Sequence, residues 1–188
     1  MSKQRVQPLA APYSQAVAEA FSIVMPPGMP PLNIFRTVGN NERVLSRMVR
    51  GGLLDRGSIT LAERELVVLR ACARCRAEYE WGVHAALFAD RAGFTPEQLW
   101  DTTEPVVETA LWSDRQISLI RLVDELHETA AVSDELWREL KRYFSDVQLI
   151  ELVMLAGLYH AVSFLVNGLQ IEKESFAPRF RERGGAHS

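Results

Sequence analysis

Apolar residues recur at helical spacing along most of the chain. Ile117, Ile120, Leu122, Val123 and Leu126 show this period within one segment, and they fall on one side of a helix. No segment alternates apolar and polar residues in the way that a half-buried strand does. The pattern therefore predicts an all-α protein.

Four segments carry a helix-start signal, in which a Ser or Thr is followed three residues later by Glu or Gln. They begin at Thr60, Thr95, Ser113 and Ser145. In this arrangement the two residues satisfy each other's exposed backbone N–H groups. Together with the apolar period, the signals predict helices over 13–24, 61–76, 79–92, 96–101, 114–130, 134–144 and 146–172, with two short helices between 33 and 54.

The length of 188 residues suits one domain with a sizeable core, expected over residues 1–175. The last stretch, residues 176–188, mixes charge and glycine without a period. This composition predicts a mobile C-terminal tail.

Charge and composition argue against several classes of protein. A net charge of −3 gives no basic surface for a nucleic acid. The longest apolar run, residues 152–166, is shorter than the roughly 20 residues that cross a bilayer, so we expect a buried helix and no membrane partner. The N-terminus lacks a secretory pattern and two cysteines are too few for a disulfide scaffold, which predicts a cytoplasmic protein.

Ionisable residues interrupt the apolar side of two consecutive helices. Glu65 shares a helix face with Val68, Leu69 and Cys72, so its carboxylate should point inward. Its neighbours at positions 63 and 64, Glu and Arg, fit solvated charges at a helix end. Burying a charge is costly, so Glu65 must pair, form hydrogen bonds or change its pKa.

The next helix repeats the pattern with Glu80, Val83, His84 and Leu87 on one stripe. Glu80 and His84 can pair locally, and Glu65 meets them if the two helices form a hairpin with a break near 75–78. A carboxylate that holds an imidazole, beside a second carboxylate, suits proton transfer. A structural ion-pair network without chemistry fits the same spacing.

The segment "LAERELVVLR" followed by "YEWGVHAALFADRAGFTPEQL" resembles the carboxymuconolactone decarboxylase-like superfamily, which includes the alkylhydroperoxidase D-like proteins. The motif region spans about residues 61–99, and the flanking segments are similar to longer members of the family. The resemblance implies a single helical domain of the alkylhydroperoxidase D-like fold. It also implies a homo-oligomer, either a dimer, a trimer or a hexamer, whose subunit contact would cover the last long helix, which is apolar almost all round.

The peroxidase branch of that family uses a C-x-x-C pair four residues before a His. In this register the chain has Ala77 and Glu80 instead of the two cysteines, so the resemblance favours the branch without the pair. Cys72 and Cys75 form a C-x-x-C five residues upstream and fit small core residues. A thiol-dependent alkyl hydroperoxide reductase that uses Cys72 and Cys75 stays open as an alternative.

The expected site is a small, mostly apolar pocket around Glu65, Glu80 and His84. His84 is the predicted general acid or base, Glu80 orients it, and Glu65 relays a proton or steadies positive charge. Tyr79 and Trp81 would shape the pocket or pack behind it. The expected substrate is a small lactone, carbonyl or carboxylate compound, in a decarboxylation or isomerisation reaction. The remaining alternative is a non-catalytic helical oligomer.

No cofactor or metal is predicted. The chain has no Gly-rich phosphate loop after a strand, which excludes the usual dinucleotide motif. It also lacks the H-x-x-x-H and H-x-x-E-H patterns and has only two soft ligands. His127 lies late in its predicted helix, where the negative end of the helix dipole favours an imidazole, so we expect a structural role. His160 is expected to be a hydrogen-bonded histidine in the core or at an interface.

Overall fold

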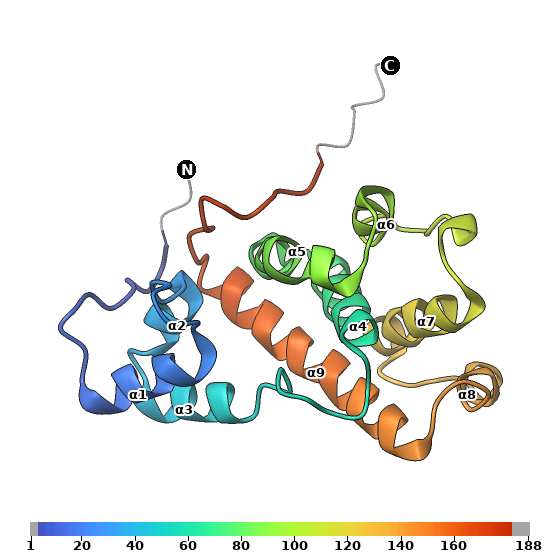
Figure 1. Cartoon of the computed structure of the whole chain (residues 1–188), viewed down its shortest axis with the longest axis horizontal. Helices are drawn as coiled ribbons and strands as arrows, with labels where there is room; N and C mark the ends of the chain where they lie inside the picture. Colours follow the sequence, from blue (N-terminus) through green and yellow to red (C-terminus); the bar gives the residue numbers. More distant parts are fainter. Residues whose placement is uncertain (1–3, 182–188) are drawn as a thin grey trace.

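This computed structural model describes residues 4–181 (Figure 1). Within these residues the chain forms nine α-helices and one short 3-10 helix, joined by loops. They are α1 Gln15–Val24, α2 Asn33–Val38, α3 Glu42–Arg50, α4 Leu61–Arg74, α5 Glu78–Ala92, α6 Pro96–Asp101, η1 Thr109–Leu111, α7 Asp114–Thr129, α8 Asp134–Leu140 and α9 Asp146–Gly168. These residues contain no strand, so the all-α prediction is confirmed.

The four predicted helix starts are all present as reciprocal caps, at the beginnings of α4, α6, α7 and α9. At α4, Thr60 Oγ1 accepts a hydrogen bond from the Glu63 backbone N–H at 3.2 Å, and Glu63 Oε2 accepts one from the Thr60 N–H at 2.8 Å. These bonds satisfy backbone groups that a helix end otherwise leaves open. They set where α4 begins, and thus which residues share its inner face.

Helix α4 lies at the centre and contacts α5, α7 and α9, while α1, α2 and α3 pack together on one side (Figure 1). The chain reverses between α4 and α5 at Arg76, which has a left-handed φ of 53°. This is the predicted hairpin. Leu69, Leu122 and Leu155 are fully buried where α4 meets α7 and α9, so the hairpin is held against the core.

The C-terminal segment packs differently from the predicted mobile tail. Residues 176–181 lie against α5 and α6, and the Phe180 ring is 5.2 Å from the Trp81 ring. The Phe180 backbone N–H donates to Glu78 Oε1 at 2.7 Å. The first part of the expected tail is therefore held by an aromatic contact that its composition did not reveal. The remainder, 182–188, lies outside the described residues.

Helix α9 combines a buried side with an exposed apolar side. It packs against α4, α5 and α7, yet Val147, Ile150, Met154 and Phe164 are exposed. By length and composition alone this 23-residue helix, with a mean hydropathy of 2.0 in its most apolar part, is long and apolar enough to cross a membrane. The core helix of a soluble protein passes the same test, so this feature is weak evidence for a membrane span.

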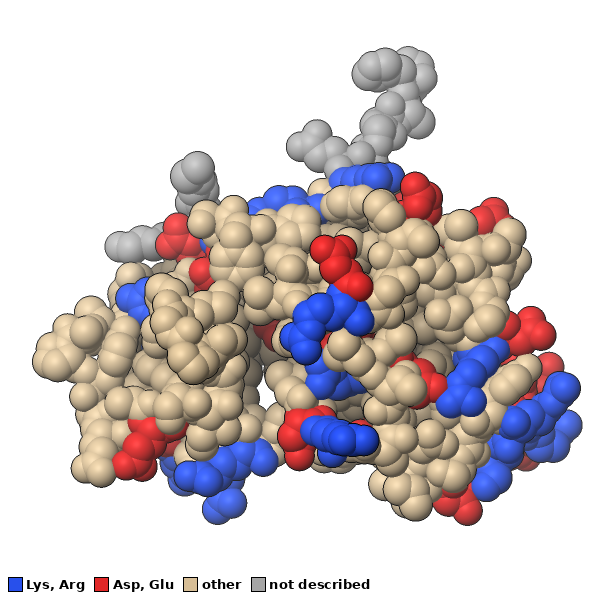
Figure 2. Space-filling model, in the orientation of Figure 1, with Lys and Arg blue, Asp and Glu red and all other residues tan. Residues whose placement is uncertain are grey.

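Basic and acidic side chains are interspersed on the face of the molecule that Figure 2 shows. No broad basic surface covers that face, in keeping with the small net charge of −3.

Candidate active site

Two of the three predicted catalytic residues meet directly across the α4–α5 hairpin. Glu65 comes from α4 and His84 from α5, and His84 Nδ1 lies 2.7 Å from Glu65 Oε2. Because a carboxylate only accepts, Nδ1–H is the donor. The side chain of Glu65 is fully buried and that of His84 is 3% exposed. The sequence-derived faces of the two helices therefore bring the expected groups together inside the protein.

The other imidazole nitrogen faces two more polar groups. His84 Nε2 is 3.0 Å from the hydroxyl of Tyr159, on α9, and 3.5 Å from Glu80 Oε1. Glu65, and not Glu80 as expected, thus makes the short bond that orients the ring. Sequence reasoning missed Tyr159, although its hydroxyl in an otherwise apolar helix next to His160 was a usable signal.

Glu80 holds an oxygen that no neighbour satisfies. Its Oε2 is buried and has no hydrogen-bond partner among the described residues. Buried polar atoms are almost always paired, so an unpaired carboxylate oxygen beside an imidazole marks a place that can accept a proton or a donor from a bound molecule. The Glu80 side chain is 10% exposed, so it lies at the solvent edge of the cluster.

Arg64 and Glu63 are engaged in pairs, which corrects their expected role as solvated charges. Arg64 Nε donates to Glu65 Oε1 at 2.8 Å, and its side chain is only 12% exposed. Glu63 is 7% exposed and accepts from Arg115 Nε at 2.8 Å. The capping bonds and Arg115 bury Glu63, whereas Arg64 stays partly exposed while it pairs with Glu65.

Charges within the cluster set the protonation state of the pair. Burial lowers the pKa of His84, but the hydrogen bonds and charges of Glu65 and Glu80 outweigh it and raise the pKa to about 9. Burial raises the pKa of Glu65, whereas His84 and Arg64 lower it below its usual value. At neutral pH the pair is therefore an imidazolium beside a carboxylate. Burial and the charge of Glu80 hold the pKa of Tyr159 well above its usual range, so its hydroxyl keeps its proton.

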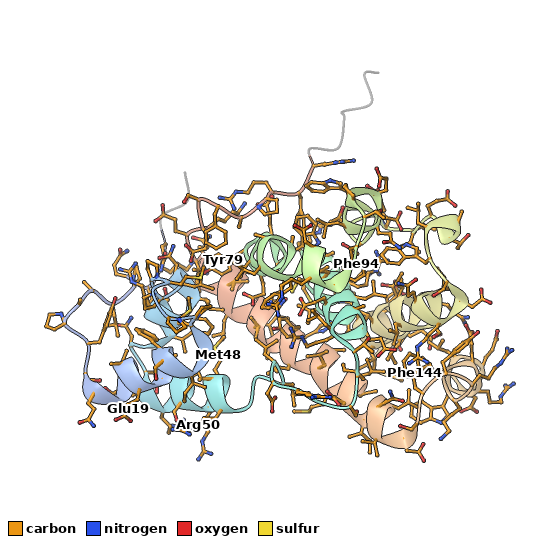
Figure 3. The ribbon with its side chains drawn as sticks, in the orientation of Figure 1. Glu19, Met48, Arg50, Tyr79, Phe94 and Phe144 are labelled. Atoms are coloured by element: carbon orange, nitrogen blue, oxygen red, sulfur yellow. The ribbon has the colours of Figure 1, made fainter. Side chains whose placement is uncertain are left out.

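The predicted substrate-binding residues are engaged elsewhere. The Tyr79 hydroxyl accepts from the Ile34 backbone N–H at 3.0 Å and donates to Glu174 Oε1 at 2.8 Å. Figure 3 shows Tyr79 near α2, at the edge of the α5 helix. Trp81 is fully buried and donates through Nε1 to Thr102 Oγ1 at 3.0 Å. Both side chains use their polar groups to join separate segments of the chain. None of these hydrogen bonds involves Glu65, Glu80 or His84, so they do not support the prediction that Tyr79 and Trp81 shape the pocket.

A broad groove of about 1850 Å³ lies apart from this cluster. Tyr79, Arg74 and His127 are among the residues that line it, and neither Glu65 nor His84 is.

The cysteines lie in surroundings that disfavour a thiolate. Cys72 is fully buried, and burial followed by the charge of Glu80 raises its pKa well above the usual range. Burial likewise raises the pKa of Cys75. Since the thiolate is the reactive form, neither sulfur has the low pKa that peroxide reduction requires.

Residues 44–125 match the family described as the Carboxymuconolactone decarboxylase family. This match and the shared fold support a relationship to the carboxymuconolactone decarboxylase-like superfamily. Glu65, Glu80 and His84 fall within the matched segment, and Tyr159 falls outside it. No curated protein matches the chain.

Solved structures share the fold of this chain at low sequence identity. One, from Ralstonia eutropha JMP134, is described as an uncharacterized peroxidase-related protein with an alkylhydroperoxidase AhpD core; it is 15% identical over 92% of each chain, with a TM-score of 0.77. A peroxidase-related protein from Silicibacter sp. TM1040 is 15% identical over 95% of this chain and 97% of its own, with a TM-score of 0.76.

A third structure is a variant of the debrominase Bmp8 in complex with 2,3,4-tribromopyrrole. It is 16% identical and covers 94% of each chain, with a TM-score of 0.71. At such identities the similarity establishes the AhpD-like fold and not a shared reaction.

Proposed function

We propose that this protein is an enzyme that moves a proton on a small lactone, carbonyl or carboxylate compound, in a decarboxylation or an isomerisation. The observation that carries the proposal is the unpaired, buried Oε2 of Glu80 beside the imidazolium of His84. A structural ion-pair network would satisfy that oxygen, because an unpaired buried acceptor costs about 1–3 kcal/mol. The match of residues 44–125 to the Carboxymuconolactone decarboxylase family supports the same reaction class.

The four side chains take separate roles in this proposal. Glu65 holds Nδ1–H and so keeps the His84 ring in one orientation. With a pKa of about 9, His84 is protonated at neutral pH and acts as the general acid from Nε2. The Tyr159 hydroxyl, 3.0 Å from Nε2, helps to stabilise negative charge that develops on a substrate oxygen.

Glu80 Oε2 is the proton acceptor. In an isomerisation it takes the proton from the carbon next to the carbonyl, the electron pair moves toward the carbonyl oxygen, and His84 protonates that oxygen. Glu80 then returns its proton to a different carbon while the enol oxygen gives its proton back to His84, which restores both groups. In a decarboxylation the electrons of the breaking C–C bond move toward the same oxygen, carbon dioxide leaves, and His84 protonates that oxygen. The enol becomes the carbonyl product when its carbon takes up a proton from solvent and its oxygen returns a proton to His84.

The substrate would enter at the side of Glu80 and Arg64, which form the partly exposed edge of the cluster at 10% and 12% exposure. A small substrate fits this edge better than a large one, since the broad groove does not reach His84. The complex of the related-fold debrominase with 2,3,4-tribromopyrrole shows a small ring compound on this fold.

The test is a panel of lactones and β-keto acids, carboxymuconolactone among them, assayed for carbon dioxide release and for exchange of carbon-bound hydrogen in D₂O. We expect His84→Gln to lower the rate by about 100-fold or more while the fold is kept. The control is Cys72→Ala, which leaves the Glu–His cluster in place. Full activity of His84→Gln would overturn the proposal, and peroxide consumption lost in Cys72→Ala or Cys75→Ser would favour the thiol reductase.

We further propose that a second copy of the chain covers the exposed row of α9. Positions 147, 150, 154, 157, 161 and 164 follow alternating steps of three and four residues, and the exposed side chains of Val147, Ile150, Met154 and Phe164 lie on this one stripe. The same stripe passes Gly157, where an added Cβ meets open space, so two helices can approach closely there. Light scattering should show an oligomer that Ile150→Glu dissociates. A monomeric wild-type protein would contradict this assembly.

A further inference from the structure

Three side chains that the proposed reaction does not use converge at one point from three helices. Cys75 is the C-cap of α4, His127 lies in the last turn of α7 and His160 lies in α9. Cys75 Sγ is 3.8 Å from His127 Nδ1, and His127 Nδ1 is 3.0 Å from His160 Nε2. One donor atom from each residue lies within 4.8 Å of the other two.

This spacing is close to that of the ligands around one small metal ion. With Zn–S near 2.3 Å and Zn–N near 2.0–2.1 Å, tetrahedral zinc separates a sulfur from a nitrogen by about 3.6 Å and two nitrogens by about 3.4 Å. The observed separations of 3.8 and 3.0 Å differ from these by a few tenths of an ångström. The third separation, between Cys75 Sγ and His160 Nε2, is within 4.8 Å, so side-chain rotations that draw these two donors together would bring all three to bonding distance.

A backbone contact already fixes the tautomer of one histidine. His160 Nδ1 lies 2.8 Å from the carbonyl oxygen of Ala156, and a carbonyl only accepts, so Nδ1 carries the hydrogen. In the neutral ring the lone pair is then on Nε2, which faces His127. Metal-binding histidines are typically held in this way, with the second ring nitrogen bonded to a carbonyl or carboxylate.

The cluster is also reachable from solvent. All three residues are partly exposed, and His127 lines the broad groove together with Arg74 and Asn167. An ion can enter from this side, and a fourth coordination position would face the groove. Cys72, one turn earlier on α4, is fully buried.

We propose that Cys75, His127 and His160 bind a borderline-soft divalent transition-metal ion, with zinc as the best match. One thiolate and two imidazoles are ligands that zinc prefers, and a three-ligand site leaves one position for a water or an exogenous ligand. On binding, the Cys75 S–H bond breaks, the sulfur bonds to the metal and the proton goes to solvent. His127, whose Nδ1–H faces the lone pair of His160 Nε2 in the metal-free chain, changes tautomer so that its hydrogen is on Nε2 and its Nδ1 bonds to the metal. The site is separate from the Glu–His cluster and independent of the proposed reaction.

The test is titration of the tag-free, chelator-treated full chain with Zn²⁺ by calorimetry, and with Co²⁺ by absorbance. We expect one ion per chain and a sulfur-to-cobalt charge-transfer band. Cys75→Ser should remove the band, and His160→Gln should weaken zinc binding by more than the roughly 10- to 100-fold that loss of an outer-shell contact costs. Cys72→Ala is the matched control, since it removes the neighbouring thiol and should keep both the band and the affinity.

Circular dichroism of each variant shows whether a loss of binding comes from a lost site or from a lost fold. As a second measure, zinc should raise the Tm of the wild-type chain and leave the Tm of the ligand variants unchanged. The proposal is overturned if the wild-type chain binds Zn²⁺ no more tightly than folded His160→Gln. Loss of the cobalt band in a folded Cys72→Ala variant would overturn it as well, because the ligands would then be the two cysteines.

Discussion

Raising the pH should weaken the fold through His84. Its pKa is about 9 in the folded protein, against 6.5 for an ordinary histidine. Below about pH 6.5 the imidazole is charged in both states, and the stabilisation is complete. Between the two pKa values the unfolded chain loses its proton while the folded protein keeps it. Above about pH 9 the stabilisation is gone.

The magnitude follows from the distance between the two pKa values. One pH unit corresponds to about 1.4 kcal/mol, so His84 should contribute about 3 kcal/mol to the free energy of unfolding below pH 6.5. The residue is 3% exposed, so solvent screening reduces this contribution little. His84→Gln removes the titrating group and keeps a hydrogen-bond donor near Glu65.

Urea unfolding of the wild-type protein and of His84→Gln, from about pH 6 to 10, measures the effect. The difference between the two curves should shrink by about 3 kcal/mol over this interval, because the other groups titrate in both proteins. NMR of labelled histidine gives the pKa directly. Parallel stability curves, or a His84 resonance that titrates at or below pH 6.5, would refute the electrostatic account of the cluster.

Three further substitutions test other contacts. Tyr159→Phe should lower turnover by about tenfold with little change in Tm, and unchanged turnover would exclude a role for the hydroxyl. Gly82→Ala would place a Cβ 2.5 Å from the Pro178 carbonyl oxygen; we expect a loss of about 1–3 kcal/mol in urea unfolding and faster proteolysis of the C-terminal segment, and an unchanged pattern would contradict that packing. Arg70→Met removes a 1% exposed guanidinium that bonds to Asp124 at 2.7 Å; unfolding should become easier by about 3 kcal/mol, and a loss below about 1 kcal/mol would show that the pair is dispensable.

The helices and the Glu65–His84 contact could be predicted because both depend on local rules. The reciprocal caps at Thr60 and Ser145 are set by residues three positions apart, and they appear as expected. The inward direction of Glu65 follows from its helix period, and the meeting with His84 needs only that adjacent helices form a hairpin. Chain reversal at Arg76 provides it.

The division of roles within the cluster could not be predicted in the same way. Local spacing suggested that Glu80 orients His84, since the two are four residues apart on one helix. Across the hairpin, however, Glu65 reaches Nδ1 at 2.7 Å, whereas Glu80 stays 3.5 Å from Nε2. The shorter contact depends on how closely α4 and α5 approach. This distance cannot be derived from the residue spacing within one helix. It leaves Glu80 with a free oxygen.

Contacts between distant segments were likewise out of reach. His127 lies 52 residues from Cys75 and 33 residues from His160, so no short motif joins them. The helix-end position of His127 was read correctly, but its ring also turns toward α9. The anchoring of residues 176–181 depends on an aromatic surface around Trp81 that forms only after the helices have packed.

Two neighbouring residues of α9 explain how one small core holds two polar clusters. Tyr159 and His160 are adjacent, and adjacent residues of a helix point about 100° apart. Tyr159 therefore reaches the Glu65–His84 pair, while His160 reaches Cys75 and His127. Helix α4 contributes to both clusters as well, through Glu65 and its C-cap Cys75. A shift of α9 along α4 would disturb both clusters together, whereas a change confined to the Tyr159 or the His160 side chain disturbs one.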